Sequence, residues 1–262
     1  MLQNLDAYKL KWIAIIGMIL NHIAIALREV VPFGLQFPLY AVGGLTFPIM
    51  AFFVVEGYRH TSNLKRYMLR IFIFGLIAQI PYMMAFRAFA LNIMFTIFLG
   101  LLVIYLYDNM KKRPLFWVIF SISLLISIIF DWAVLGILMI WMHRAIKKEN
   151  LRVIWPGLMA GIANTTLSLL GVAGLLLAQN IPGGEELAET IHQTLPVVVF
   201  GLGCFAAVLL LKKFNGERGK SMKYLFYVAY PLHLAILAAI ALALGLITFG
   251  LPLPSFGFFG AI

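Results

Sequence analysis

Charged residues are scarce in this chain of 262 residues. They make up 11% of the sequence, against about 25% in soluble domains, while hydrophobic residues reach 63% and the mean hydropathy is +0.99. So few charges leave almost no room for a soluble domain. The composition instead predicts an all-α, polytopic integral membrane protein that forms one transmembrane domain over residues 1–262.

Cysteine and signal-peptide features are also nearly absent. The single cysteine, Cys204, excludes an intramolecular disulfide. The first apolar run, from Leu10 to about Val31, is too long for the core of a signal peptide, and no Ala-x-Ala cleavage site follows it. We therefore expect this run to be retained as a membrane helix. The sequence shows no internal repeat, which gives no support to an inverted-repeat transporter.

Acidic residues are few: 10 Asp and Glu stand against 20 Lys and Arg, for a formal charge of +10. The positive charges lie between hydrophobic runs rather than inside them. The fifth and sixth runs are short and are separated only by Asp131-Trp132, which predicts either a hairpin or a broken re-entrant pair. Nine runs can be marked, at about 10–31, 38–57, 67–86, 91–107, 115–130, 132–143, 153–178, 194–211 and 224–248.

The basic residues indicate how these runs are oriented. If each of the nine runs crosses the membrane in turn, every second connecting segment lies on the same side. All Lys and Arg except Arg28 and Arg87 then fall on one side of the membrane. The acidic loop around Glu185 falls on the other side. The positive-inside rule then puts the N-terminus in the cytoplasm and the C-terminus outside, in a bacterial cytoplasmic membrane. Because the charge is explained by topology, we expect the lipid bilayer and no nucleic acid as a partner.

The stretch from Lys11 to His22 carries the most informative polar residue. Eleven residues at about 100° each bring the helix nearly back to its starting direction, so both side chains share one face, about 16 Å apart. An ionisable side chain near the centre of a membrane helix is costly and by default marks a functional site. Imidazole also transfers protons near neutral pH. We therefore predict a catalytic role for His22, supported by the adjacent amide of Asn21.

Four other runs carry a hydrogen-bonding side chain at a similar depth, about 14–18 Å from the predicted cytoplasmic end. Such groups face other helices or line a cavity, so they could meet His22 in one pocket. The alternative for the hydroxyl and amide groups is plain hydrogen bonding between helices. One of the four is His233, which lies two residues after Pro231. A proline inside a helix causes a kink, so part of the Tyr-Pro-Leu-His stretch could serve that kink. The four residues are Thr46, Gln79, Asn164 and His233.

Two polar groups lie near the predicted membrane surfaces. On the cytoplasmic side, a basic cluster suits a phosphorylated ligand, although Glu56 and His60 at i, i+4 could simply form a surface ion pair. Asp131, on the outer side, could cap the sixth run's helix. Alternatively, it could form an outward vestibule together with the other polar residues of that side, Arg28, Glu29, Asn92 and Thr96. The cytoplasmic cluster consists of Lys11, Glu56, Arg59, His60, Lys65, Arg66 and Arg70.

Several short stretches match one known family. Lys11-x10-His22 is similar to the Arg/Lys-x10-His motif of membrane acyltransferases that modify surface glycans. The other stretches are Leu10–His22, Gly44-Leu-Thr-Phe-Pro48, Phe52–Thr61, Gln79-Ile-Pro81, Asn92-Ile-Met-Phe-Thr96, Asp131 and Tyr230-Pro-Leu-His-Leu234. With them the chain resembles the TraX family over nearly its whole length. It departs from the family at Asn21, where relatives usually have Asp, and at Gly44, where they usually have Arg.

The resemblance implies an acetyltransferase that uses cytoplasmic acetyl-CoA and no metal. Its acceptor would be the N-terminal α-amine of a peptide or small protein, pilin-like or lantibiotic-like. Two alternatives stay open, an O-acetyltransferase of a surface glycan and a small-molecule transporter. The predicted roles are catalytic for His22, Asn21 and His233, donor binding for the cytoplasmic cluster, and substrate binding for Gln79, Asn92, Thr96, Asp131 and Asn164.

Overall fold

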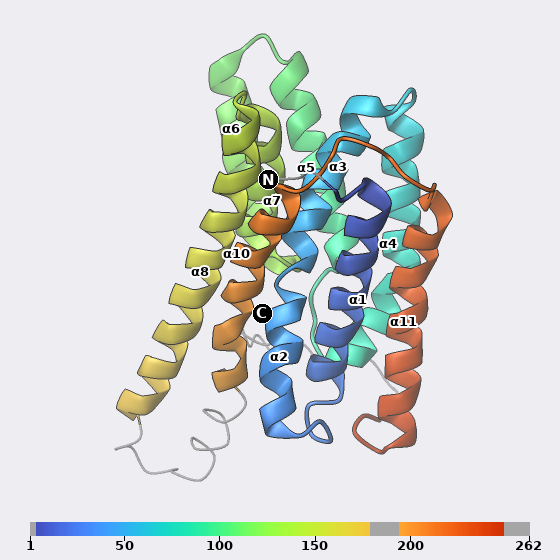
Figure 1. Ribbon diagram of the computed structural model, residues 1–262, viewed down its shortest axis with the longest axis vertical. Coiled ribbons are helices and arrows are strands. Elements are labelled where there is room, and N and C mark those ends of the chain that lie inside the picture. Colours follow the sequence, from blue (N-terminus) through green and yellow to red (C-terminus); the bar gives the residue numbers. More distant parts are fainter. Residues whose placement is uncertain (1–3, 179–193, 249–262) are drawn as a thin grey trace.

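The chain folds into a bundle of helices in the computed structural model (Figure 1), which describes residues 4–178 and 194–248. No strand occurs in these residues, so the all-α prediction is confirmed for them. The helices are α1 (Ala7–Ala26), α2 (Phe33–Gly43), α3 (Thr46–His60), α4 (Leu64–Phe86), α5 (Ile93–Asn109), α6 (Arg113–Ile126), η1 (Ser127–Ile129), α7 (Ala133–Ala145), α8 (Glu149–Ala178), η2 (Leu195–Val199), α10 (Phe200–Leu211) and α11 (Lys223–Ala243).

Each predicted hydrophobic run coincides with helix, and the chain is a membrane protein. Four helical segments are long and apolar enough to cross a membrane: Ala7–Ala26, Phe33–His60, Leu64–Phe86 and Glu149–Leu177. The other apolar helices of the described residues are shorter. The fifth and sixth runs form a hairpin, α6 and α7, joined by a turn at Asp131. The apolar residues after Phe249 lie outside the described residues.

Asparagine or aspartate side chains cap the N-termini of three helices, α1, α4 and α5. Asp6 accepts a hydrogen bond from the backbone N–H of Lys9 at the start of α1, and Asn63 does the same for Arg66 at the start of α4. Asn92 caps α5. Such caps satisfy backbone donors that the first turn of a helix leaves without a partner. They fix the helix boundaries that composition alone left uncertain.

The second predicted run is not one continuous helix. α2 ends at Gly43 and α3 begins at Thr46, so the predicted span of 38–57 is broken near its start. The break packs directly on α10, because a Cβ added at Gly44 would lie 2.0 Å from the carbonyl oxygen of Phe200. In the same contact, a Cβ at Gly203 would lie 2.0 Å from the carbonyl oxygen of Ala41. Backbones approach this closely only where both sides lack a side chain.

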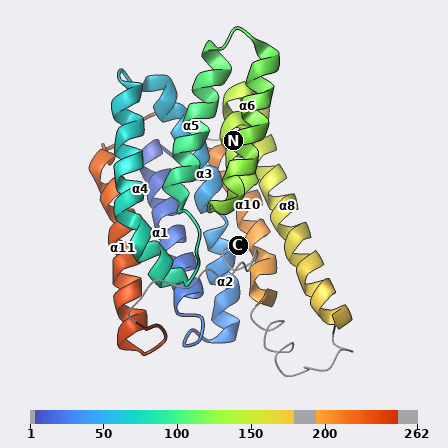
Figure 2. The same ribbon diagram turned by 180° about the vertical axis from the view of Figure 1, so that it is seen from behind.

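α1, α2 and α3 lie between two outer groups of helices. α8 and α10 lie at one side and α4 and α11 at the other, as Figures 1 and 2 both show. α4 packs on α11, α1 packs on α2, α3 and α11, and α10 packs on α8. The largest buried cluster includes Phe47, Tyr82 and Leu234 from three different helices. This arrangement puts α1, which carries His22, in contact with α11, which carries His233.

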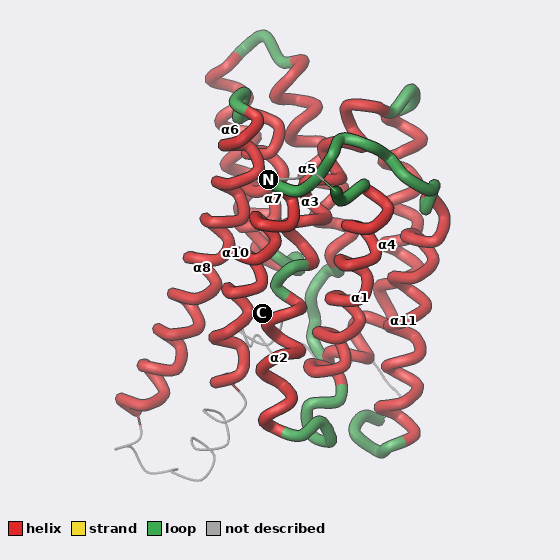
Figure 3. The backbone as a smooth tube through the Cα atoms, viewed as in Figure 1, coloured by secondary structure: helices red, strands yellow, loops and turns green. Residues whose placement is uncertain are grey.

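The loops rich in basic residues gather at one end of the bundle. The start of α1, the short connections 61–63, 110–112 and 146–148, and the long connection 212–222 all lie there (Figure 3). The long connection crosses over the start of α1, where the N–H of Leu5 donates to Lys213 and that of Ala7 donates to Glu217. We call this the basic end. Its common location agrees with the charge pattern, while the side of the membrane it faces stays a prediction.

We expect Gly203→Ala to lower the thermal stability of the detergent-solubilised protein. The added methyl group would collide with backbone atoms of α2, and overpacking of this kind typically costs about 1–3 kcal/mol. Gly34→Ala in α2 is the matched control, because no atom lies within 4 Å of its Cβ position. It should leave the melting temperature unchanged or raise it slightly. Equal melting temperatures for the two variants would contradict the close α2–α10 contact.

Candidate functional site

Two histidines from distant parts of the chain meet inside the bundle. The Nδ1 atom of His22 in α1 lies 2.6 Å from the Nε2 atom of His233 in α11. The Nδ1 atom of His233 lies 2.8 Å from the carbonyl oxygen of Ala229, one turn earlier in its own helix. His233 is only 8% exposed. The structure therefore brings together the two histidines that we predicted to be catalytic, and their ring nitrogens form one chain of hydrogen bonds.

Aromatic rings hold the pair in place. The His22 ring packs edge-to-face on Phe86 of α4 with centroids 4.8 Å apart, and on Tyr230 of α11 with centroids 6.4 Å apart. Tyr230 is 3% exposed, and its hydroxyl has no hydrogen-bond partner within the described residues. Sequence reasoning assigned Tyr230 no role, although it starts the Tyr-Pro-Leu-His stretch. The rings restrict His22 to one orientation, with α4 and α11 on either side.

A small cavity of about 60 Å³ adjoins His22. This volume holds a few water molecules or a group the size of an acetyl, and not a large ligand. Its polar lining includes the Asn21 amide, whose buried oxygen has no hydrogen-bond partner within the described residues. The predicted polar residues that line the cavity are Asn21, His22, Thr46 and Asp131. Residues with an imidazole, an amide and a carboxyl group thus line one cavity.

Asp131 reaches this cavity because of the turn between η1 and α7. Its backbone N–H donates to Leu91 at 2.7 Å, and its carbonyl accepts from the hydroxyl of Thr96 at 2.5 Å. The next residue, Trp132, has a left-handed backbone (φ 60°) and stacks on Phe47 with centroids 4.5 Å apart. Trp132 is also the N-cap residue of α7 and makes no side-chain cap. The alternative that Asp131 caps this helix is therefore not what the structure shows.

Three of the other predicted polar residues join helices to each other. Asn92 is fully buried, and its amide donates to the carbonyl of Gly75 at 2.8 Å and to the side chain of Gln79 at 2.9 Å. The Gln79 amide in turn donates to the carbonyl of Ala90. Thr46 lines the cavity, but its hydroxyl donates to the carbonyl of Ala14 in α1. These contacts match the alternative of hydrogen bonding between helices.

Asn164 does not join this arrangement. Its amide donates to the carbonyl of Ala160 in its own helix, α8, at 2.8 Å. Gln79, Asn92, Thr96 and Asn164 do not line the cavity beside His22. Counting residues from the helix ends predicted the depth of each side chain. It did not predict the direction in which each side chain points around its helix. Their roles in substrate binding stay predictions without a shared pocket to support them.

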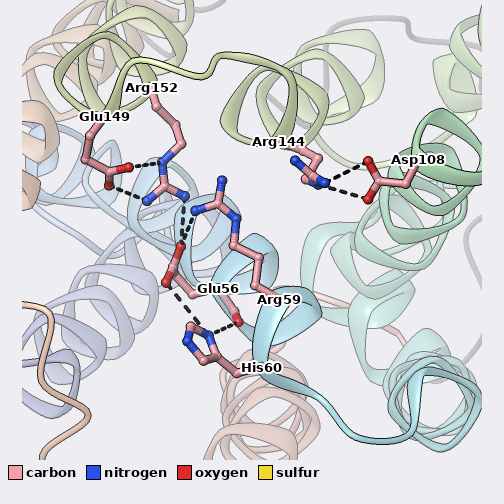
Figure 4. Close-up of polar contacts among 7 residues, drawn as sticks. All are labelled: Glu56, Arg59, His60, Asp108, Arg144, Glu149 and Arg152. Carbon is pink, nitrogen blue, oxygen red and sulfur yellow. Dashed lines mark hydrogen bonds and ion pairs between the residues drawn. The ribbon is translucent and has the colours of Figure 1, made fainter.

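At the basic end, Glu56 is the centre of an ion-pair network (Figure 4). It accepts from Arg152 of α8 at 2.8 Å and from Arg59 at 3.3 Å. Arg152 also pairs with Glu149, and its side chain is only 3% exposed. Sequence spacing predicted the contact of Glu56 with His60 but missed Arg152, which follows 96 residues later. The Glu56–Arg152 pair thus holds α3 against α8, while Arg59 pairs with Glu56 inside α3, in line with the ion-pair alternative.

The other cations of the predicted cluster have different neighbours. The Lys11 ammonium lies 5.0 Å from the ring centre of Phe53 in α3, and the Arg70 guanidinium lies 5.9 Å from that of Tyr227 in α11. Lys65 and Arg66 are exposed at the start of α4. Within the described residues, none of these four cations forms an ion pair, so they keep their charge available for an anionic ligand.

At the opposite end of the bundle, one ion pair connects two loops. Arg87 donates to both carboxylate oxygens of Glu29, at 2.6 and 2.9 Å. Burial acts to raise the pKa of Glu29, but the hydrogen bonds and charge of Arg87 outweigh it and hold that pKa below its usual value. Glu29 therefore stays ionised at neutral pH and ties the α1–α2 connection to the end of α4.

In the described residues, the fold and site define a helical membrane protein with a pair of histidines inside the bundle, beside a small cavity whose lining is mostly apolar. The family model described as "TraX protein" matches residues 6–241, and the chain belongs to the TraX family. It is 30% identical over 258 residues to the "Probable fimbrial assembly protein FimC, serogroup H1" of Dichelobacter nodosus, a match that covers 91% of this chain and 98% of that protein. No solved structure matches the chain.

We expect Asn92→Ala to destabilise the protein rather than to weaken acceptor binding. The change removes the cap of α5 and the two hydrogen bonds that the Asn92 amide donates to Gln79 and to the carbonyl of Gly75, at a cost of about 1–3 kcal/mol. Thermal unfolding in detergent measures this loss. Asn109→Ala is the control, because that exposed amide makes one bond within its own helix. If Asn92→Ala kept the stability of the unaltered protein but bound the acceptor more weakly, the prediction would be wrong and Asn92 would belong to the substrate site.

Proposed function

We propose that this protein is a multi-pass acetyltransferase of the bacterial cytoplasmic membrane. It would transfer acetyl from cytoplasmic acetyl-CoA to the N-terminal α-amine of a peptide or small protein. The observation that carries this proposal is the cavity that His22 and Asp131 both line, with His233 hydrogen-bonded behind His22. A base and a carboxylate are the groups that would bind an ammonium and then remove its proton.

The carboxylate favours an amine acceptor over a sugar hydroxyl. An α-ammonium group carries a positive charge that Asp131 would neutralise inside the bundle, where an unpaired charge is costly. A sugar hydroxyl offers no such charge. With a reference pKa of about 7.7–8.0, an α-amine also asks much less of a neutral imidazole than an alcohol does. The fimbrial assembly name of the relative supports a pilin-like acceptor.

The chemical step would run as a direct transfer. His22 would take a proton from the acceptor ammonium, and the free amine nitrogen would attack the thioester carbonyl carbon. The ammonium loses two protons in all, and His22 would release this first one to solvent. As the C–N bond forms, the C–S bond breaks, and His22 would take the second proton from the nitrogen and pass it to the departing CoA thiolate, which leaves as the thiol. Asn21 would donate to the oxyanion from its amide, a role supported by its position in the lining of the same cavity. An acetyl-imidazole on His22, formed with release of CoA, is the covalent version of the same reaction.

The size of the cavity limits how the donor could bind. About 60 Å³ accommodates the reacting acetyl group, so the pantetheine arm would have to lie between helices outside it. The seam of α1, α4 and α11 leads from the basic end to His22, since all three helices contact one another and Phe86 and Tyr230 flank the histidine. Arg66 and Arg70 stand at the basic end of this seam on α4. They are the residues that would hold the nucleotide phosphates.

His22→Ala should abolish transfer of labelled acetyl from acetyl-CoA to a peptide with a free N-terminus, because no other histidine of the described residues lines the cavity. Purified protein in detergent is assayed by mass spectrometry of the peptide. A peptide with a blocked N-terminus and an oligosaccharide serve as control acceptors. Label retained on the protein before acceptor is added, with a burst of free CoA, would indicate the covalent route. Full activity of His22→Ala would overturn the assignment.

Arg66→Ala and Arg70→Ala should each raise the KM for acetyl-CoA roughly tenfold, the effect expected for one lost charge-assisted bond to phosphate. The KM for the acceptor should not change. Lys112→Ala is the matched control, because this exposed cation lies at the same end of the bundle, in the α5–α6 connection away from α11 (Figures 1 and 2). Equal KM values for all three variants would contradict donor binding at α4.

A further inference from the structure

The two hydrogen bonds of His233 determine where its protons lie. Its Nδ1 atom is 2.8 Å from the carbonyl oxygen of Ala229, and a carbonyl oxygen only accepts. Nδ1 of His233 must therefore carry a hydrogen. In a neutral imidazole with a hydrogen on Nδ1, the other nitrogen, Nε2, has the lone pair. His233 thus presents an acceptor to whatever lies against its Nε2 atom.

The atom that lies there is Nδ1 of His22, at 2.6 Å. The ring planes differ by only 21° and the centroids are 4.9 Å apart. Two nitrogens 2.6 Å apart leave the ring centroids as far apart as 4.9 Å only if the rings meet edge to edge rather than face to face. This is the geometry of a hydrogen bond that lies in the ring planes. Because His233 accepts, His22 must donate from Nδ1. Its own lone pair is then on Nε2.

We infer that His233 is a positioning residue that fixes His22 in the Nδ1–H form, so that Nε2 of His22 is the reacting nitrogen. The catalytic consequence of this inference rests on the acetyl transfer proposed above. In metal sites and catalytic triads a second residue likewise fixes the tautomer and orientation of a working histidine. Here the second residue is itself a histidine, and a backbone carbonyl fixes its tautomer in turn.

The same chain of bonds also determines the route of the proton. When Nε2 of His22 takes a proton from the acceptor amine, the resulting imidazolium keeps its Nδ1–H bond to His233. A transfer of that hydrogen to His233 would lead no further, since the Ala229 carbonyl cannot take up a proton. The proton must therefore leave from Nε2 of His22, the atom that received it. One nitrogen serves first as the base toward the amine and then as the acid toward the CoA thiolate.

The tautomer can be tested without any activity assay. Protein with ¹⁵N-labelled histidine, in detergent or nanodiscs and without acetyl-CoA, gives separate ¹⁵N shifts for protonated and unprotonated ring nitrogens, and His22→Ala identifies the His22 signals. We expect Nδ1 of His22 to be protonated and Nε2 unprotonated near neutral pH. Protonated Nε2 on His22, or a doubly protonated His233, would overturn the inference.

Two variants of His233 test the consequence for catalysis. His233→Gln keeps an acceptor oxygen near the position of the lost Nε2, so it should keep the Nδ1–H form of His22 and most of kcat. His233→Leu removes the acceptor, so His22 should shift toward the Nε2–H form and kcat should fall about 10- to 100-fold, the range typical of such outer partners. The KM for acetyl-CoA should not change, since Arg66 and Arg70 are untouched.

The outcomes separate this inference from the proposed function. Equal kcat for the leucine variant and the unaltered protein, or equal losses in both variants while His22 keeps Nδ1–H, would refute the positioning role. If the leucine variant does not fold, the glutamine variant and the spectrum of the unaltered protein still decide the question. If the unaltered protein transfers no acetyl group, the proposed function fails, while the ¹⁵N shifts still report the tautomer by themselves.

Discussion

A polar group inside an apolar bundle is costly unless it finds a hydrogen-bond partner within the protein, and the bonds that meet this need organise the structure. Asn92 meets it by binding Gly75 and Gln79 across two helices, and Thr46 meets it at the carbonyl of Ala14. The two histidines meet it through each other and through Ala229. In each case the bond that satisfies the buried group also fixes the distance between helices. The histidine pair differs because Nε2 of His22 takes no part in these bonds and the His22 ring borders a cavity.

Close backbone contacts supply the second constraint. Gly44 and Gly203 let the α2–α3 break lie against α10 without intervening side chains. The contact leaves no space for a side chain at Gly44. A Cβ at Gly43 would likewise meet the side chain of Asn21, which lines the cavity. Glycine at these two positions therefore allows the close packing beside the cavity.

The two ends of the bundle are held by charge in different ways. At the basic end, Glu56 joins α3 to α8 through a nearly buried Arg152, and Asp108 of α5 pairs with Arg144 of α7. At the opposite end, Glu29 and Arg87 join two loops. The carboxylates of the basic end thus stabilise the side away from α4 and α11. The cations of α4 remain without an ion pair within the described residues, beside the seam that leads to His22.

Composition and hydropathy predicted the all-helical membrane fold, because apolar length alone determines where membrane helices form. The cost of a buried imidazole singled out His22 and His233, and local motifs identified the TraX family. Rotation of each helix about its axis was not predictable: Gln79 and Asn164 lie at the depth of His22 but face other partners. The Glu56–Arg152 pair, the turn that brings Asp131 to the cavity, and the bond from His22 to His233 all join distant segments. Only tertiary packing decided them, because a single helix does not encode which neighbour each of its faces meets.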